Sequence, residues 1–94
     1  MIVLVVRYLG KQGRGDEIAE AMREMAPLAR EEDGCELYLV ARSTQNRDAF
    51  FLHEHYRDER AYDVHRETEH FKRIVEGRVM PMLESREREI GELL

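Results

Sequence analysis

An uninterrupted apolar run near the start of the chain, Ile2 to Val6, restricts the possible folds most strongly. It is too short for a buried helix, is mostly β-branched, and has no polar face to turn toward solvent. Such a run is typical of a central strand that is covered on both faces. The pattern therefore predicts a sheet built around residues 2–6, which Arg7 and Tyr8 extend.

A helix with one apolar face is expected next. After a turn at residues 11–15, apolar side chains recur at helical spacing, with charged residues between them, at Ile18, Met22, Met25 and Ala29. Asp16 is the expected N-cap, because its carboxylate can accept hydrogen bonds from the first turn. Pro27 should bend the helix because it lacks an N–H, and Gly34 should end it because glycine tolerates positive φ.

A hairpin and two short helices follow in the pattern. Residues 35–41 and 50–56 alternate as strands around a turn at 45–48. Strand parity puts one set of side chains on a common face, namely Phe50, Leu52, Glu54 and Tyr56. Asp58 and Thr68 are expected to cap two helices, one through His65 and one that ends before Pro81.

The segment from Leu83 onward is compatible with two secondary structures. Its glutamate and arginine content favours a helix, whereas its charge density also fits a protected edge strand. As a strand it completes the order β-α-β-β-α-β, the split βαβ motif of ferredoxin-like folds. As a helix it leaves a three-stranded sheet.

Composition limits the domain count and the partners. The 94 residues form one α+β domain, residues 1–94, and 37% are charged, so the core is thin and dimerisation is expected. A net charge of −5 argues against nucleic acid, and no apolar stretch is long enough to span a membrane. The apolar run is too short for a secretory signal, and the single cysteine, Cys35, fits a cytoplasmic protein.

Glu54 is the most informative polar residue, because its parity directs a carboxylate into an apolar face. A buried carboxylate is costly unless it is hydrogen-bonded or paired. His65 or His70 could supply the partner, since the helices must cover one face of the sheet. Glu54 could therefore belong to a ligand pocket, or it could order the following helix.

The four histidines suggest either acid–base chemistry or a metal. His65 lies on the inward stripe of its helix, one turn after Ala61, where an imidazole could accept a proton from a phenol or an enol. It could equally be a core histidine bonded to backbone. His70 lies in a first helical turn, which disfavours its protonated form. His53 and His55 share a strand face but lack further ligands at metal-site spacing, so no metal is expected.

Several other side chains are candidates for ligand contacts. Tyr38 and Tyr56 could line a pocket for a planar ligand or could be ordinary strand aromatics, and Phe71 fits the core. Arg7 could contact an anionic substrate or form a salt bridge at a dimer interface. Cys35 has no neighbouring base in the sequence, which favours a structural thiol over a nucleophile.

The order of these residues resembles that of the antibiotic biosynthesis monooxygenase domain family. The similarity is carried by residues 31–38, by residues 51–56, and by Ala61, His65 and residues 68–71, which follow in order with short gaps. The resemblance implies a dimeric α+β barrel in which two ferredoxin-like subunits pack sheet against sheet. It also implies that residues 83–92 form a strand at the dimer interface.

The same resemblance implies a pocket between sheet and helices, with Glu54, Tyr56, His65, His70 and Phe71 at the matching positions. The implied activity is a monooxygenase that needs neither metal nor organic cofactor and acts on a small phenol or quinol with molecular oxygen. His65 or His70 would be the base and Glu54 would orient it. The chain has no tryptophan, which argues against the haem-degrading branch of the family. A non-catalytic ligand-binding or stress-associated dimer and an isomerase that uses the same pocket are the alternatives.

Overall fold

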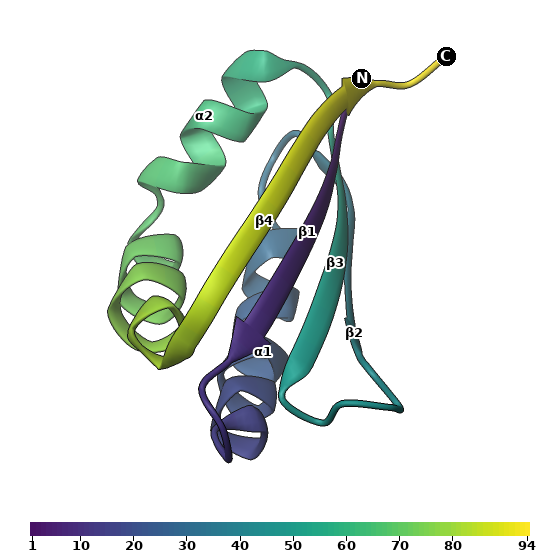
Figure 1. The fold of residues 1–94 in the computed structure, drawn as a ribbon. Coiled ribbons are helices and arrows are strands. Elements are labelled where there is room, and N and C mark those ends of the chain that lie inside the picture. Colours follow the sequence, from purple (N-terminus) through teal and green to yellow (C-terminus); the bar gives the residue numbers. More distant parts are fainter.

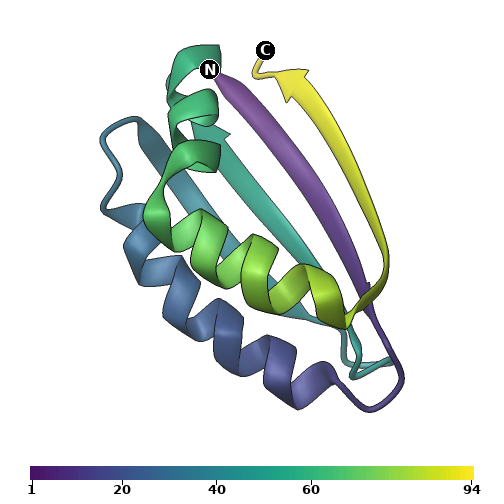
Figure 2. The same cartoon turned by 90° about the vertical axis from the view of Figure 1, so that its left-hand side faces the viewer.

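A computed structural model describes residues 1–94, and in it a four-stranded antiparallel sheet carries helices on one face (Figures 1 and 2). The elements are β1 (Ile2–Gly10), α1 (Gly15–Arg30), β2 (Cys35–Arg42), β3 (Ala49–Tyr56), α2 (Glu59–Glu67), a π-helical segment (Phe71–Val79), a 3-10 turn (Met80–Met82) and β4 (Leu83–Glu92). This order confirms the split βαβ motif and the ferredoxin-like α+β fold.

The strands lie in the order β2-β3-β1-β4. The apolar strand β1 is central, as its sequence predicts, and pairs with β3 on one side and with β4 on the other. β4 is an edge strand that follows β1 from Ile2 opposite Glu92 to Gly10 opposite Leu83. The backbone ladder along this whole length outweighs the helix propensity of the glutamates and arginines, so the strand interpretation of residues 83–92 is confirmed.

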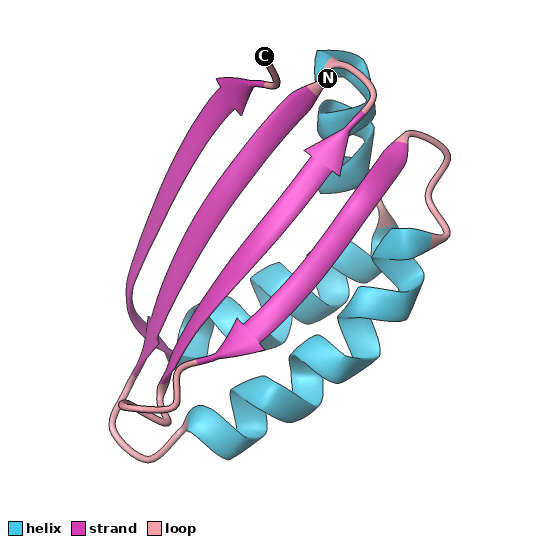
Figure 3. Ribbon diagram, turned by 90° about the vertical axis from the view of Figure 1, so that its right-hand side faces the viewer, coloured by secondary structure: helices cyan, strands magenta, loops and turns pink.

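The two faces of the sheet differ in what covers them. Alternate residues of the strands, among them Leu4, Val6 and Leu52, point toward the helices and are buried in one core. The opposite face carries no helix and is turned toward the viewer in Figure 3. Apolar side chains remain open to solvent there, with Val5 39% and Leu39 49% exposed.

The helix caps match the sequence only in part. Asp58 accepts a hydrogen bond from the Ala61 N–H at 2.8 Å, and the Thr68 hydroxyl accepts one from the Phe71 N–H at 3.2 Å. Both caps were expected. Gly34 has a φ of 118°, as the expected turn after α1 requires, and α1 itself continues through Pro27 to Arg30.

Asp16 is not the N-cap of α1, which corrects the expectation from its position. The cap comes instead from the hairpin, where the Asp48 carboxylate accepts from the N–H groups of Gly13 at 3.0 Å and Gly15 at 2.9 Å. Asp16 points outward and accepts from Arg42 at 2.9 Å. A residue 33 positions away could not be identified as the cap from local sequence.

None of the helices has the length and apolar character needed to cross a bilayer.

Candidate functional site

A cavity of about 280 Å³ lies between the helix-facing side of the sheet and the helices that follow β3. β3 supplies Glu54 to its wall, α2 supplies His65, the π-helical segment supplies Phe71, and the edge strand β4 supplies Arg86 and Arg88. Glu76, Arg66, Tyr8 and Tyr62 also line it, so the site combines two carboxyl groups, an imidazole, three aromatic rings and three guanidinium groups around one volume. A cavity of this size is at the small end of those that bind organic ligands.

His65 is the buried centre of this arrangement, with only 2% of its surface exposed. Its Nδ1 lies 2.8 Å from Oε1 and 3.0 Å from Oε2 of Glu32. An ionised carboxylate can only accept, so Nδ1 must carry the hydrogen. In the neutral imidazole the lone pair is then on Nε2, the nitrogen that lies 3.7 Å from Oε1 of Glu54. This tautomer makes His65 a proton acceptor on the side of Glu54.

Aromatic rings fix the orientation of that imidazole. The ring of Tyr56 lies 5.0 Å from it, that of Phe71 lies 5.1 Å away with an edge-on contact, and that of Tyr38 lies 5.8 Å away, measured between centroids. Tyr62 stacks at 6.4 Å. Such packing leaves His65 few alternative rotamers.

Glu54 is a carboxyl group in apolar surroundings, with 5% of its surface exposed. Its Oε1 accepts a hydrogen bond from the Tyr56 hydroxyl at 2.5 Å. Burial raises the pKa of Glu54 above the usual carboxyl range, and the Tyr56 hydrogen bond and nearby His65 offset this only in part. Burial and the neighbouring Glu54 also raise the pKa of Tyr56, so this phenol stays protonated and acts as a donor.

Glu32 is a further residue of the site, and its position in the sequence did not identify it as a functional group. It lies just after α1 and bridges two histidines, accepting from Nδ1 of His65 and, at 2.6 Å, from Nε2 of His70. Burial acts to raise the pKa of Glu32, but the two imidazole hydrogen bonds outweigh it and the pKa lies below the usual range. Glu32 is therefore an ionised acceptor that holds both rings.

Positive charge reaches the cavity from the edge strand. Arg86 and Arg88 point from β4 toward the helices, and Arg88 donates to the Tyr62 hydroxyl at 2.6 Å. Guanidinium groups that line a cavity favour an anion inside it over a neutral molecule. The acidic residues Glu54 and Glu76 line the same volume, so the charge of the wall is mixed.

The structure brings together most of the residues singled out in the sequence. Glu54, His65 and Phe71 line the cavity, whereas Tyr56 and Tyr38 pack behind them. Of the two histidines expected near Glu54, it is His65 that approaches its carboxyl group.

Two of the candidates lie elsewhere. His70 does not line the cavity and is connected to it only through Glu32. Arg7 is on the uncovered face of the sheet, where its guanidinium lies 5.8 Å from the ring centroid of Phe51. No group of three or more histidine, cysteine, aspartate or glutamate side chains is arranged to hold a metal ion.

Solved structures share the whole architecture. A crystal structure of PA3566 from Pseudomonas aeruginosa superposes with a TM-score of 0.91 at 24% identity, over 99% of this chain and 93% of that one. A protein from Nitrosomonas europaea, provisionally named an antibiotic biosynthesis monooxygenase, gives 0.92 at 24% identity, over 100% and 99%. Another structure named antibiotic biosynthesis monooxygenase gives 0.92 at 22% identity, again over 100% and 99%. At these identities the similarity establishes the fold.

Sequence comparison establishes the family. A search among curated proteins gives no significant match. The family model described as antibiotic biosynthesis monooxygenase matches residues 1–77. This range includes β1, the hairpin of β2 and β3, and the four site residues Glu32, Glu54, His65 and His70. The match covers far more than half of the 94 residues, so the chain belongs to the antibiotic biosynthesis monooxygenase family.

Proposed function

We propose that this protein oxygenates a small phenol or hydroquinone in the cavity, with His65 as the base that removes the phenolic proton. The observation that carries the proposal is the contact of His65 Nδ1 with the Glu32 carboxylate at 2.8 Å, which leaves Nε2 as the acceptor of the neutral imidazole. Family membership supports oxygen chemistry as the class of reaction. The substrate itself supplies the electrons.

The reaction balances without a further reductant. Removal of the phenolic proton by His65 gives a phenolate, whose ring carbon opposite the oxygen is electron-rich and reacts with dioxygen. One oxygen atom forms a new carbonyl at that carbon and the ring loses two hydrogens, so that a phenol and dioxygen give a quinone and water. Two electron pairs leave the ring system, and the second oxygen atom is reduced to water.

The surrounding groups would each assist this step. Arg86 and Arg88 would stabilise the phenolate, because guanidinium groups that line the cavity attract an anion by charge and bind its oxygen through their N–H donors. Burial of Glu54 raises its pKa and so favours its neutral form, which opposes an anion less than an ionised carboxylate does. Glu32 would stabilise the imidazolium that forms when His65 takes up the proton, as the carboxylate of a catalytic triad does.

We also propose a homodimer that forms through the uncovered face of the sheet. Val5 and Leu39 are exposed there beside half-buried Phe51, an arrangement that a second sheet could cover. A thin core under a charged surface gains stability from such burial. The dimer would place the two cavities on its outer sides, beneath the helices of each subunit.

Oxygen uptake with 1-naphthol as the probe tests the proposed activity. We expect formation of the quinone with one atom of ¹⁸O from ¹⁸O₂, without hydrogen peroxide. His65→Gln should lower the rate by about 10²- to 10⁴-fold, the usual contribution of a general base. Arg60→Gln, at an exposed residue of α2 that lines neither the cavity nor the uncovered face of the sheet, is the control and should leave the rate unchanged.

The outcomes separate the alternatives. Equal oxygen uptake by the wild type and His65→Gln would remove His65 from the role of base. Saturable binding of phenols to the wild type with no turnover would favour a ligand-binding protein. Conversion of an enolisable substrate without oxygen consumption, lost in His65→Gln, would favour an isomerase.

A further inference from the structure

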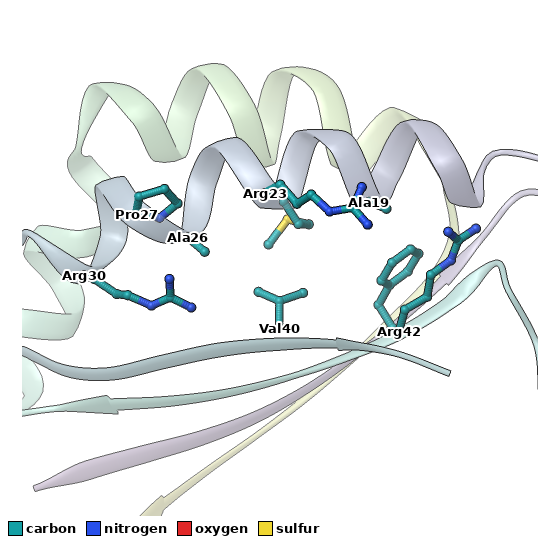
Figure 4. A pocket seen from close by; sticks show the side chains of 9 residues that line it. Ala19, Arg23, Ala26, Pro27, Arg30, Val40 and Arg42 are labelled. Carbon is teal, nitrogen blue, oxygen red and sulfur yellow. The ribbon is translucent and has the colours of Figure 1, made fainter. Parts of the chain in front are cut away.

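A second hollow lies away from the His65 cavity, at the other edge of the sheet. It is a groove of about 300 Å³ between α1 and the edge strand β2. Its floor and walls are apolar, with Met22, Ala26, Val40 and Phe50 among the lining residues. In Figure 4 Val40 lies on the strand side of the groove, opposite α1, which contributes the small residues Ala19 and Ala26 among its lining residues.

Three arginines surround this groove, and no acidic side chain lines it. Arg23 and Arg30 come from α1 and Arg42 comes from β2. Figure 4 shows the guanidinium groups of Arg30 and Arg42 toward the two ends, with Val40 between them. The chain as a whole carries a net charge of −5, so a groove whose charged lining residues are all cationic departs from the average surface.

Much of the hydrogen-bonding capacity of these arginines is unused. Arg23 makes no hydrogen bond or ion pair with another side chain, and Arg30 uses only Nε, which donates to the Tyr38 carbonyl at 3.0 Å. Arg42 is held in place by the Arg47 carbonyl at 2.7 Å and by Asp16 at 2.9 Å. Arg42 is thus a fixed cation, and the terminal nitrogens of Arg23 and Arg30 are free to bind an anion.

The geometry points to a binding site for a small organic carboxylate with an apolar body, and we propose it as a function separate from the His65 cavity. The apolar part would lie over Val40 and Phe50, and the carboxylate would face the guanidinium groups, which bind carboxylates through paired donors. A peptide strand is less suitable, because Arg30 already occupies the outward carbonyl of Tyr38 on the β2 edge that an added strand would use.

Titration of ¹⁵N-labelled protein with sodium octanoate, followed by NMR, tests this proposal. Saturable shifts should appear at the amides of α1 and β2, including Ala26 and Val40. The matched alcohol, 1-octanol, should bind about tenfold more weakly, because it loses the partly exposed ionic contacts. The double variant Arg23→Gln/Arg30→Gln should show a similar loss for octanoate and none for octanol.

Two further variants control the result. Arg60→Gln removes an exposed arginine on α2 that has no ion pair, and it should bind octanoate like the wild type. Ala26→Leu should fill the groove and weaken octanoate and octanol alike. Shifts centred on His65 and Tyr62, equal affinity for acid and alcohol, or an equal loss in Arg60→Gln and the double variant would each overturn the proposal.

Discussion

Glu54 of the cavity and the half-buried Glu32 behind His65 should respond in opposite directions to the same substitution. Glu32 is an acceptor for two imidazoles, whose hydrogen bonds lower its pKa against the effect of burial. Glu54 is in apolar surroundings that raise its pKa. Replacement by glutamine retains the shape and removes the charge, so Glu32→Gln and Glu54→Gln separate the effect of charge from that of packing.

Glu32→Gln should destabilise the protein at neutral pH. A glutamine oxygen can accept from one of the two rings, while its NH₂ group faces the N–H of the other. Hydrogen bonds to a charged acceptor contribute about 1.5–3 kcal/mol each and neutral ones about 1 kcal/mol, so weakening two of them should cost roughly 2 kcal/mol. Because the folded pKa of Glu32 is lowered, its stabilisation is present above the unfolded pKa of about 4.3 and is lost as the pH falls further.

Glu54→Gln should have the opposite pH dependence. A raised folded pKa means that the unfolded carboxyl group ionises first, so the wild type loses stability as the pH rises above about 4.3. Glutamine does not ionise, and its oxygen can still accept from the Tyr56 hydroxyl. The variant should therefore gain stability relative to the wild type with rising pH, by up to about 1.4 kcal/mol per pH unit between the two pKa values.

Urea denaturation of the wild type and both variants between pH 3 and pH 8 measures these differences. Imidazole ¹⁵N shifts add a direct readout, because the wild type should carry the His65 hydrogen on Nδ1 and Glu32→Gln should change the tautomer of one ring. The reasoning is refuted if Glu32→Gln is as stable as the wild type at pH 7. It is also refuted if Glu54→Gln does not gain stability relative to the wild type as the pH rises.

Three further substitutions test the fold around the site. Asp48→Ala should cost about 1–2 kcal/mol in urea denaturation because it removes the cap of α1, whereas Asp33→Ala, whose ion pair is exposed, should change stability by less than about 0.5 kcal/mol. Gly34→Ala should cost at least about 1–3 kcal/mol of stability, because the φ of 118° is strained for alanine and the new Cβ would lie 2.6 Å from a side chain of α2. Gly91→Ala places its Cβ in open space and should not lower the stability in this way. Equal costs for the two variants would contradict this reasoning. Light scattering should give twice the 11.2 kDa chain mass for the wild type and the monomer mass for Val5→Asp, and a monomeric wild type would contradict the proposed dimer.

The fold was largely predictable because its signals are local. The apolar run at Ile2 is a central strand, and the parity of β3 correctly directs Glu54 toward the helices. Asp58 and Thr68 cap the helices they precede. The cap of α1 was not predictable, because Asp48 reaches it from a hairpin far along the chain.

The chemistry of the site was harder to predict from the sequence, because the contacts that determine it join segments far apart in the chain. Glu32 and His65 are 33 residues apart, and Glu32 lies in a run of acidic residues that looks like solvated helix end. Nothing in that run distinguishes the carboxylate that meets two imidazoles from its neighbours. Only the packing of α2 against the end of α1 selects it.

In β4 the pattern that indicates a strand is the alternation of charge sign along the sequence, not an alternation of hydrophobicity. Arg86 and Arg88 alternate with Glu87 and Glu89, and the register of β4 on β1 turns both arginines toward the cavity and both glutamates toward the uncovered face. A helix would mix these signs on its surface, whereas a strand with period two separates them. A slip of one residue would bring the glutamates into the cavity beside Glu54, so the strand register fixes the charge available to a bound anion.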